Sequence, residues 1–409
     1  MMGPFLLLDK STFQCLSRHA VHALFRYYSV VVPPVLVSEI QADYSKRKIG
    51  PKQFSFLVKK FENHSFEAIV DQRRLMRGNL LGDDVPMDGR PVVPGHQLSE
   101  GLHATAVFTK SERSKTIERW LTGCISPAEI AASQEWRSGS KSIDLEKFRH
   151  TFKDMPLPKL STPKQALQFV DACLINGKQE RLLETMASDA RLTGPEMADL
   201  RERWTKAGKP PMASFAPYAT YCTRAASVFT IALMNGIVTT RPTNYIDLQY
   251  LYYLPFCQAF SSGDKLHADL GSLFLRADQI AINSALLKYD LEALQTFWSG
   301  LSFAQRHIWI QRFGFWPPTA SHSFTYQAWK RFAVPKKYSG NALSKLPPDV
   351  RRKVQEEFQA AVTQWKARGN TSEPEMVIKS INLPGSGISG IVMDKRNAWR
   401  YQSRPSEEL

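Results

Sequence analysis

Short apolar runs alternate with amphipathic segments in the first 50 residues. Residues 5–8 and 30–32 are apolar throughout, which is typical of strands buried on both faces of a sheet. Residues 11–28 between them have the spacing of an amphipathic helix. A second helix follows Pro33–Pro34, because proline suits a first helical turn, where its missing N–H needs no partner. This alternation predicts an α/β fold with a mainly parallel sheet.

The alternation of apolar runs and amphipathic segments stops after about residue 48 and resumes near residue 218. Residues 49–217 are polar, charge-rich helical segments broken by proline and glycine, and we interpret them as a helical insertion. Apolar helices are then predicted over 225–234 and 245–253, with a short strand over 256–260. We therefore expect residues 1–48 and 218–300 to form one discontinuous α/β domain. Residues 301–409 are expected to form a helical C-terminal extension with a loosely ordered tail.

Composition and charge narrow the class of protein. With 43% hydrophobic and 22% charged residues among 409, most of the chain is expected to fold. The 53 basic residues exceed the 38 acidic ones, and the net charge of +15 favours a polyanionic partner, nucleic acid above all. Five widely separated cysteines form no CxxC pair, which indicates a reducing compartment such as the cytoplasm. The apolar stretch 225–238 is too short to span a membrane, so no membrane association is expected.

Several enzyme classes lack their signatures. The nine histidines show no HExxH spacing, and no GxSxG, Walker-type or GxGxxG sequence occurs. Zinc hydrolases, serine hydrolases, P-loop ATPases and dinucleotide-binding enzymes are therefore disfavoured.

Four acids beside core elements are the strongest chemical signal. Asp9 follows the first strand, Glu39 lies on the helix after Pro33–Pro34, Asp247 begins an apolar helix, and Asp264 follows the strand over 256–260. Carboxylates brought together repel one another unless a cation lies between them, so their convergence implies Mg²⁺ or Mn²⁺. Taken singly, each acid also has an ordinary interpretation as a helix cap, a turn residue or a solvated side chain.

The order of these elements resembles the PIN-domain family of metal-dependent nucleases. The strongest part of the resemblance runs from Asn244 to Asp264, where two acids lie 17 residues apart and Ser262 stands two residues before the second. Leu6-Leu-Leu-Asp9 and Val35-Leu-Val-Ser-Glu39 supply the amino-terminal part. The resemblance covers residues 4–48 and 218–300, and it requires the insertion to return the chain to the same sheet.

The resemblance implies a nuclease that hydrolyses phosphodiester bonds. The expected substrate is RNA, which would make the protein an endoribonuclease. In this interpretation Asp9, Asp247 and Asp264 hold the metal, and Glu39 binds through water or orients the attacking water. Asp43 and Asp269 are alternatives to Glu39 and Asp264. His267 is either a phosphate or proton-transfer group or a packing residue.

Nucleic-acid contacts and partners stay more open. Basic clusters, Lys46-Arg47-Lys48 and Lys59-Lys60 among them, can attract phosphates or simply face solvent, and Ser262 and Lys265 are added as contacts beside Asp264. The first alternative to a nuclease is a non-catalytic PIN-like scaffold that binds RNA or protein. The second is a role in a toxin–antitoxin or anti-phage pair, in which an inhibitory protein partner binds the insertion or the extension.

Overall fold

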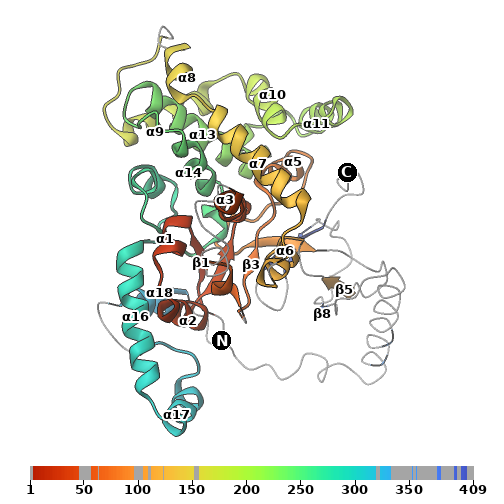
Figure 1. The fold of residues 1–409 in the computed structure, drawn as a ribbon. Helices are drawn as coiled ribbons and strands as arrows, with labels where there is room; N and C mark the ends of the chain where they lie inside the picture. Colours follow the sequence, from red (N-terminus) through yellow and green to blue (C-terminus); the bar gives the residue numbers. More distant parts are fainter. Residues whose placement is uncertain are drawn as a thin grey trace.

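The centre of the molecule is a five-stranded parallel sheet (Figure 1). In this computed structural model, the strand order is β3 (Glu67–Ala68), β2 (Ser29–Val32), β1 (Phe5–Leu8), β6 (Ala259–Ser262) and β7 (Ile280–Asn283). The described residues are 3–45, 57–62, 64–95, 105–108, 112–122, 124–151, 156–318, 323–332, 352, 356, 375–378, 391–393 and 398–402. The predicted α/β class with a parallel sheet is confirmed.

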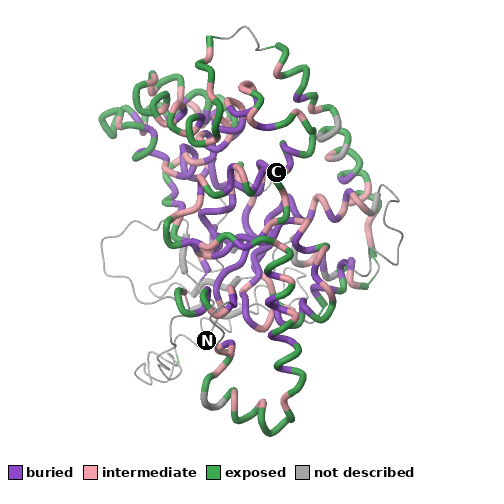
Figure 2. Tube along the Cα trace, turned by 90° about the vertical axis from the view of Figure 1, so that its left-hand side faces the viewer, coloured by how far each residue is buried: buried purple, intermediate pink, exposed green. Residues whose placement is uncertain are grey.

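Burial explains why the strands are so apolar. Every residue of β1 is buried, and Figure 2 shows the buried segments gathered at the middle of the molecule. The helices α2 (Arg18–Tyr27) and α16 (Ser284–Gly300) pack against one another beside the sheet. Helix α1 (Lys10–Cys15) follows β1 directly, and α3 (Pro34–Ser45) follows β2, so both begin at the carboxyl ends of their strands. Parallel strands buried on both faces need no alternation of polar residues.

The middle region is mostly helical, as predicted. Its long helices lie above the sheet in Figure 1. The helices in order are α5 (Gln72–Leu80), α6 (Glu112–Leu121), α7 (Pro127–Ser142), α8 (Leu145–Thr151), α9 (Pro163–Asn176), α10 (Gln179–Asp189), α11 (Gly194–Lys206) and α12 (Met212–Phe215). Helix α13 (Pro217–Met234) then packs against α9 and α5 and leads through α14 (Thr243–Leu251) back to the sheet.

The range 49–217 is not wholly helical. It supplies β3 at the edge of the main sheet, together with β4 (Val92–Gly95) and β5 (Thr105–Phe108). The apolar Ile69 and Val70 beside β3 are fully buried, but Glu67 within the strand interrupts the apolar pattern that would have marked it. The strand expected at 256–260 is also displaced, because Pro255 lies in a short 3-10 turn (Leu254–Phe256) and β6 begins only at Ala259.

The C-terminal extension contains strands as well as helices. Helices α17 (Phe303–Phe313) and α18 (Phe324–Phe332) fit the expectation, and Trp329 of α18 is buried, with its indole N–H donating to the carbonyl oxygen of Tyr27. The strands β8 (Glu375–Ile378), β9 (Ile391–Met393) and β10 (Trp399–Gln402) correct the expectation of a helical extension, since β10 pairs with β4 and β8 with β5. Most of the expected loose tail lies outside the described residues.

Within the parts of the chain that the structure describes, no helix is both long and apolar enough to cross a membrane.

Candidate functional site

Asp9 lies where β1 ends and α1 begins. Its carboxylate caps α1 by accepting the backbone N–H of Thr12 at 2.7 Å, and it also accepts the hydroxyl of Ser11 at 2.8 Å. The side chain is buried, with only 3% of the residue exposed. The acid at the carboxyl end of the central strand therefore has a defined orientation before any ligand is considered.

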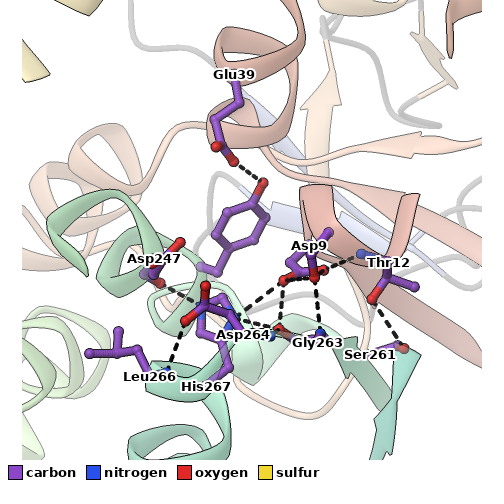
Figure 3. Close-up of polar contacts among 12 residues, drawn as sticks. Asp9, Thr12, Glu39, Asp247, Ser261, Gly263, Asp264, Leu266 and His267 are labelled. Atoms are coloured by element: carbon purple, nitrogen blue, oxygen red, sulfur yellow. Dashed lines mark hydrogen bonds and ion pairs between the residues drawn. The ribbon is translucent and has the colours of Figure 1, made fainter. Parts of the chain in front are cut away.

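Ser262 and His267 complete the surroundings of Asp9. The Ser262 hydroxyl donates to Oδ2 of Asp9 at 2.5 Å, and Nδ1 of His267 lies 2.7 Å from the same hydroxyl oxygen (Figure 3). Gly263 brings the next turn close: a Cβ there would meet the Ser284 hydroxyl at 2.5 Å and the Ser11 hydroxyl at 3.2 Å. Of the Ser262-Gly263-Asp264 segment, the serine is the residue that contacts Asp9.

The hydrogen bonds of Ser262 determine where the protons of His267 lie. The Ser262 oxygen accepts the N–H of Asp264 at 2.9 Å, and its only proton is directed to Asp9. With Asp9 ionised, Nδ1 of His267 donates to that oxygen, while Nε2 donates to the backbone carbonyl of Asp247 at 2.7 Å. This arrangement matches the imidazolium form of His267, in which both ring nitrogens carry protons.

The ionisation of Asp9 and His267 follows from this pairing. Burial raises the pKa of Asp9, but the hydrogen bond and charge of His267, with the hydroxyl of Ser262, outweigh burial and leave the pKa below its ordinary value. Burial lowers the pKa of His267, yet Asp9 at 3.5 Å and the Asp247 carbonyl hold this pKa above its ordinary value. His267 therefore neutralises Asp9 in the described structure.

Asp247 has the opposite character. It lies on α14, and its Oδ2 is a buried atom with no hydrogen-bond partner among the described residues. Burial, opposed by His267 but reinforced by the charges of Asp264 and Glu39, raises the pKa of Asp247 to about 7. A buried carboxylate oxygen without a donor, repelled by two other acids, marks a place that lacks a positive charge.

Asp264 stands in the turn after β6. Its Oδ1 accepts the backbone N–H of Leu266 at 2.9 Å. One of the two carboxylate oxygens therefore has the ordinary role of a turn residue. Asp269, the alternative acid, forms an ion pair with Lys265 at 2.6 Å on the exposed surface. Lys265, predicted to contact nucleic acid, is thus held beside an acid four residues away.

Glu39 faces the same region from α3. The hydroxyl of Tyr250, on α14, donates to Glu39 at 2.6 Å, and Nζ of Lys10 lies 3.5 Å away. Burial raises the pKa of Glu39, although Lys10 and Tyr250 both oppose the rise. Asp43, one helical turn further along α3, pairs more closely with Lys10 at 2.8 Å. Glu39 is therefore the acid of this helix that connects to α14.

The four predicted acids come from four separate segments of the chain and lie in one region beyond the carboxyl ends of β1 and β6 (Figure 3). The charges of Asp264 and Glu39 act on Asp247, and the charge of Asp9 acts on Glu39, so the side chains are electrostatic neighbours. Nevertheless, no three acidic, histidine or cysteine side chains of the described residues are placed to hold a metal ion. Asp9 is engaged by its polar neighbours, and one oxygen of Asp264 by Leu266.

The donor set suits a hard divalent cation in chemical type, since all four acids offer carboxylate oxygens and Asp247 has a free one. The carboxylates of Asp247 and Asp264 are of the type that binds such an ion, whereas Asp9 shares its charge with His267 and Glu39 is contacted by Tyr250 and Lys10.

Sequence reasoning missed two positioning residues, and one predicted cluster stays untested. Tyr250 and Lys10 support Glu39, and only the i, i+3 spacing of Tyr250 from Asp247 along α14 could have suggested that both face one side. His267 had been left open between two roles. The predicted basic cluster Lys46-Arg47-Lys48 lies outside the described residues.

Comparison with protein-family models, with curated proteins and with solved structures finds no match for this chain.

Proposed function

We propose that this chain is a PIN-like, metal-dependent nuclease that hydrolyses phosphodiester bonds in RNA. The observation that carries the proposal is the buried, unpartnered Oδ2 of Asp247, on whose carboxyl the charges of Asp264 and Glu39 act. Open α/β folds bind their ligands at the carboxyl edge of the sheet. A buried group of like charges is costly for stability, and a divalent cation would offset the cost.

Each acid has a separate role in this proposal. Asp247 and Asp264 would hold Mg²⁺ or Mn²⁺, and Asp9 would supply a third carboxylate. Such an ion, when bound, neutralises the scissile phosphate and lowers the pKa of a bound water. Glu39, held by Tyr250 and Lys10, orients the attacking water and accepts its proton.

Charge supports nucleic acid as the substrate. The net charge of +15 attracts phosphates over a long range, whereas the four acids repel them locally. The cations that bind the substrate must therefore lie around the acidic edge, not within it.

The proposal is tested by titrating Mg²⁺ and Mn²⁺ against labelled single-stranded RNA, structured RNA and DNA. Wild type should cleave RNA only with a divalent ion, and Asp264→Asn should lose cleavage by about 100-fold or more while RNA binding is kept or strengthened. Asp269→Asn is the matched control, because it removes an equal charge from an exposed ion pair five residues away. Equal cleavage by wild type and Asp264→Asn would refute the assignment.

A specific observation favours a second candidate, a non-catalytic scaffold of the same fold. His267 already neutralises Asp9 as a built-in cation, and the described residues present no ready set of three metal ligands. In that case Mn²⁺ should leave the thermal unfolding temperature of wild type unchanged, because an ion that does not bind the folded state cannot stabilise it. A rise that Asp264→Asn abolishes favours the nuclease.

A further inference from the structure

A small pocket lies beside the first turn of α2, outside the group of acids. Its volume is about 280 Å³, and its walls come from α2 and from the 3-10 turn η1 (Lys59–Phe61) with the residues after it. The charged and titratable side chains that line it are Arg18, His22, Lys59, Lys60, Glu62 and His64. Three full positive charges and two histidines thus face one acid.

Lys60 forms a fixed, buried part of this wall. Only 3% of the residue is exposed, and Nζ donates to the carbonyl oxygens of Phe13 at 2.6 Å and Leu16 at 2.8 Å, at the end of α1. Burial lowers the pKa of Lys60 to about 8, so most of this side chain is charged at neutral pH. The Lys59-Lys60 pair is therefore not simply a solvated surface cluster.

The two histidines are held by ring contacts. His64 stacks on Phe25 with centroids 4.3 Å apart, and His22 meets His64 edge-on at 5.8 Å. Burial lowers the pKa of His22, and so do the neighbouring charges of Arg18 and Arg26. Burial also lowers the pKa of His64, with His22 and Arg26 adding to it. Cations crowd this pocket, and an anion would relieve the repulsion.

Arg18 and Lys59 are the accessible cations. Both are exposed, and neither forms a salt bridge with an acid among the residues that the structure describes. Some other cations of the described residues are paired, as Lys10 is with Asp43 and Arg224 with Asp171. Glu62, the one acid among the lining residues that the structure describes, is exposed as well.

We propose that this pocket binds a phosphate group of the RNA backbone. The inference rests on the proposed function and adds a substrate-binding subsite to it. The volume is slightly below the range of pockets that enclose drug-sized ligands, so it suits one phosphate with its sugar better than a whole cofactor. Arginine and lysine donors facing a single small space are typical phosphate ligands.

Helix α1 connects the pocket to the acids. It begins at its cap Asp9 and ends at the carbonyls that Lys60 holds, and six residues of helix span about 9 Å. An RNA strand bound over the group of acids can therefore place a neighbouring phosphate in the pocket. The pocket is lined by cations, which attract the phosphate that the acids repel.

The test measures binding without divalent ions, so that cleavage plays no part. Fluorescence anisotropy gives the affinity of a labelled single-stranded RNA at several salt concentrations, for wild type and for Arg18→Gln/Lys59→Gln. The double variant should bind about 10-fold more weakly at low salt, and its salt slope should fall by about 0.7, because one phosphate is no longer neutralised. Lys164→Gln/Arg181→Gln is the matched control, because it removes the same charge from exposed positions of α9 and α10.

A gain-of-affinity variant guards against weaker binding caused by misfolding. Glu62→Gln removes the only acid among the described lining residues and should strengthen RNA binding several-fold. Inorganic phosphate, titrated alone, should raise the pKa values of His22 and His64 in wild type, as followed by NMR, and should compete with RNA. If the pocket variant behaves like the control, or if phosphate binds there while RNA affinity is unaffected by the variants, the proposed RNA subsite is refuted.

The two proposals fail separately. If wild type cleaves no RNA but the pocket variant weakens RNA binding, the nuclease is refuted and the phosphate site stands. If wild type cleaves RNA and the pocket variants bind it normally, only the pocket is refuted.

Discussion

Nε2 of His267 donates a hydrogen bond to the backbone carbonyl oxygen of Asp247 at 2.7 Å. Nδ1 of the same ring contacts the Ser262 hydroxyl, which in turn donates to Asp9. One imidazolium therefore connects the turn after β6 with α14 and β1. The carbonyl of Asp247 is held in place while its carboxylate is left without a donor. The position of this acid is thus fixed by its backbone, and its charge is free to be matched by something else.

Asp247→Asn should stabilise the protein at pH 8. The folded-state pKa is raised to about 7, against about 3.9 in an unfolded chain, so the folded state holds a proton that the unfolded state lacks between these values. Stability therefore declines as pH rises from about 4 to about 7 and stays lower above. We expect a gain of about 1–3 kcal/mol at pH 8 that disappears near pH 4, measured by urea unfolding without divalent ions. A gain independent of pH would contradict this account; Asp269→Asn is the control.

His267→Gln should destabilise the protein most at low pH. Because Asp9 raises the pKa of His267 above its unfolded value of about 6.5, the stabilisation is complete below that pH and disappears as pH rises through the folded pKa. We expect a decrease of about 3–5 kcal/mol at pH 6 and a smaller decrease at pH 9, measured by chemical denaturation. His19→Gln, at an exposed position of α2, should change little at either pH. A decrease that grows with pH would be inconsistent with an imidazolium.

Tyr250→Phe should shift the pH dependence of RNA cleavage. The Tyr250 hydroxyl stabilises the charged form of Glu39, so its removal raises the pKa of Glu39 further. The acidic limb of the kcat/KM profile should move up by about one pH unit or less. Tyr245→Phe, on the exposed side of the same helix, should leave the profile unchanged. An unchanged profile in Tyr250→Phe would remove Glu39 from the proton transfer.

Lys60→Met should destabilise the fold through α1. The ammonium satisfies the buried carbonyl oxygens of Phe13 and Leu16, and methionine keeps the length of the side chain but donates nothing. The unpaired carbonyls should cost about 2–4 kcal/mol in the free energy of unfolding. Lys59→Met, on the adjacent exposed position, should stay within about 0.5 kcal/mol of wild type. Equal effects of the two substitutions would show that the carbonyl contacts are unimportant.

The pattern of apolar residues and prolines predicted the elements whose position depends on their own sequence. The strands at 5–8 and 30–32 are apolar because helices cover the sheet, and the helix after Pro33–Pro34 starts where proline allows it. The two-residue strand β3 could not be found, since it exists only because β2 lies beside it. The pairing of β10 with β4, about 300 residues apart, likewise leaves no local pattern.

The sequence indicated the four acids that lie in one region of the structure, but not the residues that contact them. Asp9 and Asp264 follow strands, as their sequence positions indicate, whereas Glu39 and Asp247 lie inside α3 and α14 rather than at their first turns. The imidazolium state of His267 depends on Ser262, Asp9 and Asp247 meeting in space, and Lys60 is buried by the end of a helix about 45 residues earlier. Such contacts depend on tertiary packing rather than on residue type.

The place of β1 in the middle of the sheet sets an order of events during synthesis. β2 is available to β1 almost at once, but β6 follows only about 250 residues later, which at 5–20 residues per second is roughly 13–50 s of translation. During that interval one edge of β1 has no partner strand, and Asp9 has neither Ser262 nor His267. A ribosome-bound chain therefore carries no assembled group of acids until the turn after β6 has emerged.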